Sequence, residues 1–140
     1  MILLDTNIIS ELISAASATD VLQWAETIPA DSLYLSAITI AEMRFGVEMM
    51  DHGKRRNGIE QSINALVESD YKGRILPFDH LAGDVYGALV ARLKRQGMNI
   101  DQNDAMIAAI ALRYDIPVAT RNVKHFAPCG VNVINPFEIQ

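Results

Sequence analysis

The stretch Ile2-Leu3-Leu4-Asp5-Thr6-Asn7 (residues 2–7) predicts how this chain of 140 residues folds. Three consecutive apolar residues that end at a carboxylate are typical of a short strand inside a parallel sheet whose two faces are both covered. Asp5 then lies where the strand ends. Because ligands of open parallel sheets bind beyond the carboxyl ends of the strands, Asp5 is the first candidate for a functional residue.

The rest of the chain alternates between short apolar runs and segments of helical periodicity. We expect strands at 2–4, 33–35, 74–78, 116–119 and 131–134. We expect helices at 8–13, 18–28, 36–50 with Ser36 as its N-cap, 58–68, 79–96 and 101–114, and a polar turn at 51–56. This alternation predicts a single α/β domain over residues 1–140, with a mostly parallel sheet of about five strands.

The composition excludes several classes of protein. A formal net charge of −5 argues against broad, non-specific binding of nucleic acid. Cys129 is the one cysteine, so the chain has no disulfide framework and no basis for a cysteine-type zinc site. The N-terminus does not resemble a signal peptide, and no apolar run approaches the roughly 18 residues that span a bilayer. We therefore expect a soluble, cytoplasmic protein that does not associate with membranes.

Two further carboxylates stand out. Glu42 falls in the helix at 36–50, between Ile38 and Phe45 on a face that we expect to be largely apolar. Asp104 falls in the first turn of the helix at 101–114, which is apolar nearly all round and should be buried.

Two of the three acids also have a purely structural interpretation. Asp5 could cap the helix that follows it, and Glu42 could form a capping box with Thr39. Asp101 is the better candidate for the cap of its helix, which leaves Asp104 without a structural explanation.

The three acids should meet at one edge of the sheet, because Asp5 ends a strand and the other two lie near the starts of helices that leave the same edge. Carboxylates gathered in this way repel one another unless a cation lies between them. Oxygen ligands favour Mg²⁺ or Mn²⁺ over zinc, and Mg²⁺ held by a few carboxylates typically acts on phosphate groups.

A fourth polar segment, Thr120-Arg121-Asn122, follows the strand at 116–119. Its side chains could supply oxygen ligands or contact a phosphate, although the segment could equally be an ordinary polar turn. Basic side chains that could follow a nucleic-acid backbone include Arg44, Arg121 and Lys124. The three histidines have no ligand spacing, and we assign no role to His52, His80 or His125.

These segments together resemble a PIN domain, and in particular the toxins of the VapC/FitB-like group. The matching segments are residues 1–11 around Asp5, 35–46 around Glu42, 104–109 around Asp104, and 118–126 around Asn122, with a closing match at 133–137. Each motif alone is weak. Their order and spacing over essentially the whole chain are specific.

The resemblance implies a three-layer α/β/α PIN-like fold and a ribonuclease that uses Mg²⁺ or Mn²⁺. It implies that Asp5, Glu42 and Asp104 bind the metal and act in catalysis. It further implies an RNA substrate, a homodimer, and a cognate antitoxin that inhibits the enzyme and binds operator DNA, as in type II toxin–antitoxin systems. Candidates for further ligands, or for residues that orient the ligands, are Asn122, Asp101, Thr6, Asn7 and Thr120.

The chain departs from the family at one position, because many members have aspartate where this chain has Asn122. Asparagine can still offer a carbonyl oxygen, but it adds no negative charge, which weakens the case for a second metal ion. Asp101, one turn before Asp104, is a hypothetical replacement.

Two alternatives stay open at this level. A phosphoryl-transfer domain of the haloacid-dehalogenase or receiver type also places an aspartate after its first strand. The former expects a second aspartate at the position of Asn7, and the latter expects a nearby acidic pair and a late lysine. The other alternative is a PIN-like module that binds RNA or a partner without cleaving it, with Asn122 marking the loss of catalysis.

Overall fold

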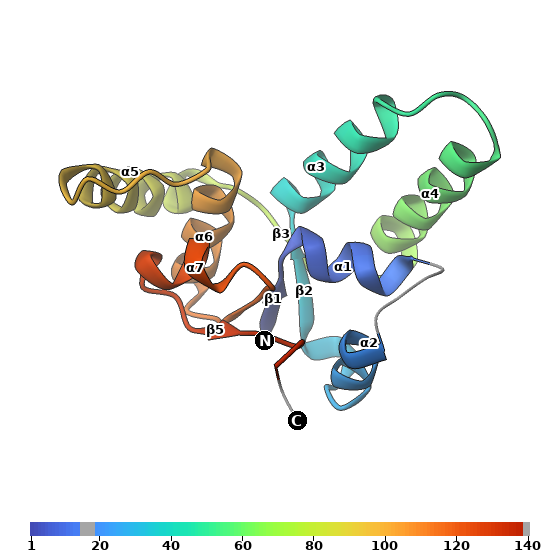
Figure 1. Cartoon of the computed structure of the whole chain (residues 1–140), viewed down its shortest axis with the longest axis horizontal. Helices are drawn as coiled ribbons and strands as arrows, with labels where there is room; N and C mark the ends of the chain where they lie inside the picture. Colours follow the sequence, from blue (N-terminus) through green and yellow to red (C-terminus); the bar gives the residue numbers. More distant parts are fainter. Residues whose placement is uncertain (15–18, 139–140) are drawn as a thin grey trace.

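In the computed structural model, which describes residues 1–14 and 19–138, a sheet lies between two layers of helices (Figure 1). The strands pair in parallel throughout, in the order β3-β2-β1-β4-β5, so the N-terminal strand is central. The strands are β1 (Ile2–Leu4), β2 (Leu33–Ser36), β3 (Ile75–Leu76), β4 (Val118–Ala119) and β5 (Val133–Ile134). The predicted α/β class and parallel sheet are confirmed.

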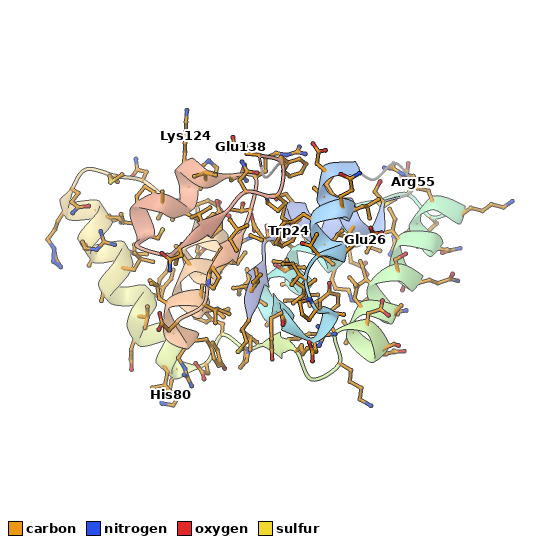
Figure 2. All side chains as sticks on the ribbon, turned by 90° about the horizontal axis from the view of Figure 1, so that it is seen from below. Trp24, Glu26, Arg55, His80, Lys124 and Glu138 are labelled. Carbon is orange, nitrogen blue, oxygen red and sulfur yellow. The ribbon has the colours of Figure 1, made fainter. Side chains whose placement is uncertain are left out.

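The central strand explains why the fold has three layers. Side chains of a strand alternate between its faces, so Leu3 and Leu4 point into different cores. Leu3 packs with the helices α5 (His80–Arg95), α6 (Gln102–Tyr114) and α7 (Val123–Phe126). Leu4 packs with the helices α1 (Thr6–Ile13), α2 (Thr19–Glu26), α3 (Ala37–Glu48) and α4 (Lys54–Ala65). Side chains fill the space between the sheet and both layers, while Arg55 and Lys124 extend from the periphery (Figure 2).

Side-chain caps fix where the helices beside the sheet begin. The Ser36 hydroxyl accepts a hydrogen bond from the Thr39 N–H at 3.1 Å. Asp101 Oδ2 accepts from the N–H groups of Asn103 and Asp104 at 3.1 and 3.3 Å. These contacts confirm the predicted caps at Ser36 and Asp101. They also exclude the capping box of Thr39 with Glu42, because the helix begins before Thr39.

Several predicted boundaries were wrong. The segment 51–56 is only partly a turn, because α4 begins at Lys54, where basic residues with good helix propensity follow Gly53. Three strands are shorter than predicted: 75–76 rather than 74–78, 118–119 rather than 116–119, and 133–134 rather than 131–134. The second strand is one residue longer, 33–36 rather than 33–35. The helix predicted at 18–28 ends at Glu26, and residue 18 lies outside the described residues.

Short elements were also missed. They are α7 and the 3₁₀ turns η1 (Ala30–Ser32) and η3 (Ala127–Cys129), whereas the helix predicted at 58–68 corresponds to the end of α4 and the π-helical turn η2 (Leu66–Asp70). Runs of three to five residues are too short to show a helical period in the sequence.

The apolar face of α3 was also predicted wrongly. Its buried residues are Thr39, Met43 and Val47, whereas Phe45 and Met49 are 68% and 71% exposed. The helix has apolar side chains on more than one face, so the sequence could not show which of them packs against α4. Within the described residues, no helix combines the length and apolarity needed to cross a membrane.

Candidate active site

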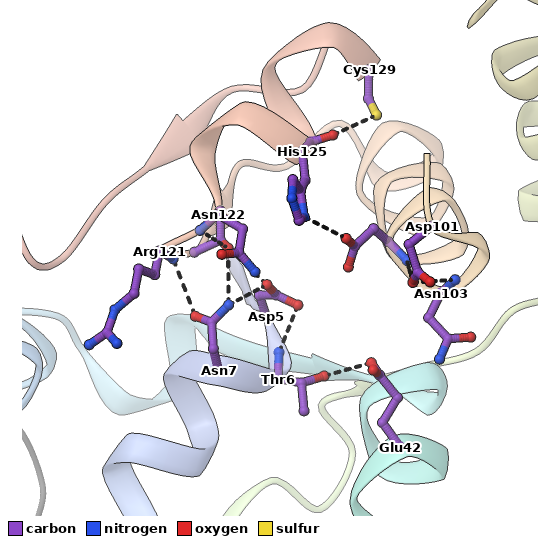
Figure 3. A network of polar contacts seen from close by, with 12 residues as sticks. Asp5, Thr6, Asn7, Glu42, Asp101, Asn103, Arg121, Asn122, His125 and Cys129 are labelled. Atoms are coloured by element: carbon purple, nitrogen blue, oxygen red, sulfur yellow. Dashed lines mark hydrogen bonds and ion pairs between the residues drawn. The ribbon is translucent and has the colours of Figure 1, made fainter. Parts of the chain in front are cut away.

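The three acids lie on three elements that meet at the carboxyl edge of the sheet, and Figure 3 labels two of them, Asp5 and Glu42. Asp5 directly follows β1, Glu42 lies in the second turn of α3, and Asp104 lies in the first turn of α6. Their charges act on one another, because Asp104 repels both Asp5 and Glu42. The fold therefore brings the three acids into one cluster, as the sequence predicted.

Asp5 is held by a set of hydrogen bonds that uses both of its oxygens. Oδ1 accepts from the Thr6 N–H at 2.8 Å, and Oδ2 accepts from the Thr120 hydroxyl and from Asn7 Nδ2, each at 2.8 Å. Only 3% of Asp5 is exposed. Burial raises the pKa of this carboxyl, while the bonds from Thr120 and the Thr6 N–H lower it and the charge of Asp104 raises it further. Asp5 thus both caps α1 and presents a buried carboxylate to the cluster.

Glu42 is oriented by a hydroxyl from another helix. The Thr6 hydroxyl donates to Glu42 Oε1 at 2.8 Å (Figure 3). It also lies 3.0 Å from the Thr39 hydroxyl. The side chain of Glu42 therefore has a hydrogen-bond partner in Thr6. It faces the acidic cluster and not the apolar core. Thr6 directly follows Asp5 in the chain. Residues 5 and 6 therefore supply one of the three acids and orient a second, Glu42.

Asp104 has a partner that the sequence did not reveal. His125 Nδ1 lies 3.0 Å from Asp104 Oδ2, and the side chain of Asp104 is only 15% exposed. Burial raises the pKa of Asp104, the hydrogen bond with His125 lowers it, and the charges of Asp101 and Glu42 raise it. The absence of a role for His125 was a wrong inference. The sequence analysis did not predict the short helix α7, which brings His125 close to Asp104 at the start of α6.

The segment after β4, residues 120–122, contacts the acidic cluster through Thr120. Thr120 is fully buried, and its hydroxyl receives the Asn122 N–H at 2.9 Å while donating to Asp5. Thr6, Asn7 and Thr120 therefore contact the acids, as expected for residues that orient ligands. Asn122 contributes its backbone here, and Asp101 acts as the cap of α6.

The basic candidates differ in their surroundings. The Arg121 guanidinium lies 3.7 Å from the Glu11 carboxylate and stacks over the Phe137 ring, so protein contacts hold it beside the site. Arg44 donates to Asn64 and joins α3 to α4. Lys124 is exposed at the start of α7.

The donor set of the cluster fits a hard divalent cation. Partly buried carboxylates that repel one another are stabilised when a cation neutralises them, and oxygen ligands suit Mg²⁺ or Mn²⁺. Over residues 1–14 and 19–138, no three acidic, histidine or cysteine side chains converge tightly enough to enclose an ion by themselves. Mg²⁺ in proteins typically keeps several waters and takes one or two carboxylates as ligands.

An open groove begins at the acidic cluster and runs between α1, α3 and α4. Its volume is about 740 Å³, with Thr6 and Glu42 at one end and Lys54 and Arg55 at another part of its wall. Apolar side chains form much of the surface between them. They are Ile13, Met43, Val47, Met50, Ile59 and Ile63.

Known proteins resemble this chain over its full length. The family model for the PIN domain matches residues 2–127. The chain is 44% identical to the VapC ribonuclease Y4jK of Sinorhizobium fredii, over 99% of each protein. It is 37% identical to the toxin FitB of Neisseria gonorrhoeae, over 98% of this chain and 99% of that protein. The crystal structure of FitAcB from the same organism superposes with a TM-score of 0.92 at 37% identity, over 99% of this chain and all of that one.

Proposed function

The chain belongs to the PIN-domain family, and from this membership and its acidic cluster we propose that it is a metal-dependent endoribonuclease, the toxin of a type II toxin–antitoxin pair. The observation that carries the proposal is the cluster of Asp5, Glu42 and Asp104 at the carboxyl edge of the sheet, with the pKa of both aspartates raised. A phosphoryl-transfer domain is not supported, since the family match covers the segments that hold all three acids.

The residues of the cluster divide the work of hydrolysis. Asp5 and Asp104 would hold Mg²⁺ or Mn²⁺, and Glu42 would bind the ion or orient the attacking water. When bound, the ion supplies a water of lowered pKa and neutralises charge that develops on the phosphate. Thr6 holds Glu42, Thr120 and Asn7 hold Asp5, and His125 holds Asp104. The ligand oxygens are therefore oriented before the substrate arrives.

The direct test is cleavage of RNA by the purified protein with Mg²⁺ or Mn²⁺, in parallel with a chelator. We expect internal cleavage that requires the ion and returns when the ion is restored. A folded protein that binds RNA tightly without the ion, and cleaves none of a broad panel of RNAs, would instead support the binding module that Asn122 suggests.

Replacing Thr6 by valine is expected to lower the rate of cleavage by about 10- to 100-fold, the usual loss when a residue that orients a metal ligand is removed. Valine keeps the shape of threonine but cannot donate the 2.8 Å hydrogen bond to Glu42. Thr6→Ser, which keeps the hydroxyl, serves as the matched control. Rates measured over a range of Mg²⁺ concentrations test the prediction, and equal rates for Thr6→Val and wild type would contradict it.

We further propose that the groove between α1, α3 and α4 binds a segment of the cognate antitoxin. Solved relatives include toxin–antitoxin complexes, among them FitAB bound to DNA. An open groove with an apolar floor suits the apolar face of a helix. Because the groove begins at Glu42, a segment lying in it would obstruct access to the acids. The homodimer remains a prediction.

Replacing Gly46 by phenylalanine is expected to free the enzyme from its antitoxin. Gly46 lines the groove, and an added Cβ would meet no atom within 4 Å, so a side chain can begin there without a clash and we expect the phenylalanine ring to occupy part of the groove. We expect the variant to cleave RNA in the presence of an antitoxin that silences wild type. Gly46→Ala is the control, because its small side chain leaves the groove open and stabilises the helix by about 0.5–1 kcal/mol. Equal inhibition of all three proteins would place the antitoxin elsewhere.

A further inference from the structure

A small pocket of about 140 Å³ adjoins the acidic cluster on the side of α7. It lies between the end of α5, the segment 98–101 and the start of α7. His125 belongs to both places, since it is one of the residues that line the pocket and its Nδ1 lies 3.0 Å from Asp104 Oδ2. A group in this pocket would therefore be close to a phosphate bound at Asp104.

The lining of the pocket combines apolar and polar residues. Leu93, Ile100 and Pro128 contribute apolar surface, and the His125 ring adds a flat aromatic one. Asn99, Asp101 and Lys124 contribute polar groups. Proteins recognise an unpaired RNA base with this combination, because its faces pack on aromatic or apolar side chains while its edges form hydrogen bonds. Lys124 also extends from the surface, where it can attract a backbone phosphate (Figure 2).

Asp101 would make the pocket favour some bases over others. Its Oδ2 accepts from two N–H groups of α6, whereas its Oδ1 has no partner among the described residues. An ionised carboxylate only accepts hydrogen bonds, so it favours a base edge that donates them. The Watson–Crick edge of guanine carries two adjacent donors. In uracil a single N–H lies between two carbonyl oxygens, which a carboxylate repels.

We propose that this pocket binds the base of a nucleotide next to the cleaved phosphodiester, and that Asp101 makes it prefer guanine and disfavour uracil. The proposal rests on the proposed ribonuclease activity for the position of the cleaved bond. Binding of the base is independent of that activity, because it can be measured without metal and without cleavage. Asp101 then has a second role besides capping α6.

The test titrates the four nucleoside 5′-monophosphates, and ribose 5-phosphate, into the metal-free full-length protein and follows the methyl NMR signals of Met98 and Ile100, which line the pocket. We expect GMP to shift both signals with an affinity at least about tenfold higher than that of UMP, the lower end of the range expected for one additional hydrogen bond to a charged group. Shifts that are equal for all the ligands, or absent, would overturn the base pocket. Neither result would bear on metal-dependent cleavage, which is assayed separately.

Asp101→Asn is the decisive variant, because asparagine caps a helix as well as aspartate does but carries no charge. We expect its ratio of GMP to UMP affinity to fall toward one. Asp84→Asn, the same change at an exposed position of α5 outside the pocket, should keep the wild-type ratio. A second readout compares the cleavage rates of oligonucleotides that carry guanosine or uridine at a single position. A preference that persists unchanged in Asp101→Asn would show that Asp101 does not select the base.

Discussion

Replacing Asp5 by asparagine is expected to lower RNA cleavage by more than about 100-fold, beyond the usual loss for a residue that only orients a ligand. Asparagine offers one neutral oxygen where the cluster has a charged carboxylate, so the affinity for a divalent cation falls. The helix cap survives, because the new Oδ1 can still accept the Thr6 N–H that Asp5 accepts now. The new Nδ2 would instead face the Thr120 hydroxyl and the Asn7 amide, which now donate to Oδ2, so we expect some loss of stability beside the loss of chemistry.

The measurement is the initial rate of cleavage of a defined RNA at saturating Mn²⁺, with circular dichroism and thermal unfolding run on the same samples. Asp84→Asn again provides a matched change at an exposed position. A folded Asp5→Asn protein that retains wild-type rates would remove Asp5 from the active site and, with it, the basis of the proposed mechanism.

Asp104→Asn is expected to have opposite effects on activity and on the stability of the metal-free protein. The carboxylate of Asp104 is largely buried and repelled by its neighbours, so its pKa lies above the usual 3.8. Ionising such a group in the folded state costs free energy, which asparagine avoids while still accepting a hydrogen bond from His125. The variant should lose cleavage, as Asp5→Asn does, but unfold at a higher temperature than wild type in a chelator.

The sign of the pH dependence follows from the raised pKa values. The folded protein holds these protons more tightly than the unfolded chain does, so the stabilising contribution of Asp5 and Asp104 is complete below pH 3.8. It is lost as the pH rises through their higher folded pKa values. The advantage of Asp104→Asn over metal-free wild type should therefore be largest at neutral pH and shrink toward pH 4.

Adding the metal should reverse the order of the two proteins. An ion that binds only the folded wild type stabilises it by about 2.7 kcal/mol at 100 times its dissociation constant. Thermal unfolding at several pH values, with chelator and with Mg²⁺, checks all three parts of the prediction. A variant that is less stable than wild type in the chelator at pH 7 would mean that Asp104 is not strained in the metal-free fold.

The sequence predicted the parts of this structure that depend on local pattern. The apolar run at 2–4, the caps at Ser36 and Asp101, and the gathering of the three acids all follow from strand and helix signals that act over a few residues. The strand order could not be derived in the same way, because pairing of β1 with β4 joins segments that lie far apart in the chain.

The contacts that tune the site were also hidden in the sequence. The bond from Thr6 to Glu42 depends on how α1 packs against α3, and the contact of His125 with Asp104 depends on a helix of only four residues. The exposure of Phe45 on α3 was missed for a related reason, since apolar spacing does not show which side of a helix meets its neighbour. Tertiary packing decided all three.

The central position of the N-terminal strand has a consequence for how the protein is synthesised. Asp5 accepts a hydrogen bond from Thr120, which lies 115 residues later in the chain. At 5–20 residues per second, the ribosome synthesises Thr120 roughly 6 to 23 s after Asp5. Until then β1 lacks β4, one of its two neighbouring strands. The sheet that positions Asp5 relative to Asp104 is therefore incomplete. A nascent chain stalled before β4 leaves the ribosome should therefore bind no metal and cleave no RNA, even with all three acids already outside. The cell that makes this protein thus has an interval, during each round of translation, in which an antitoxin can find the chain before it becomes active.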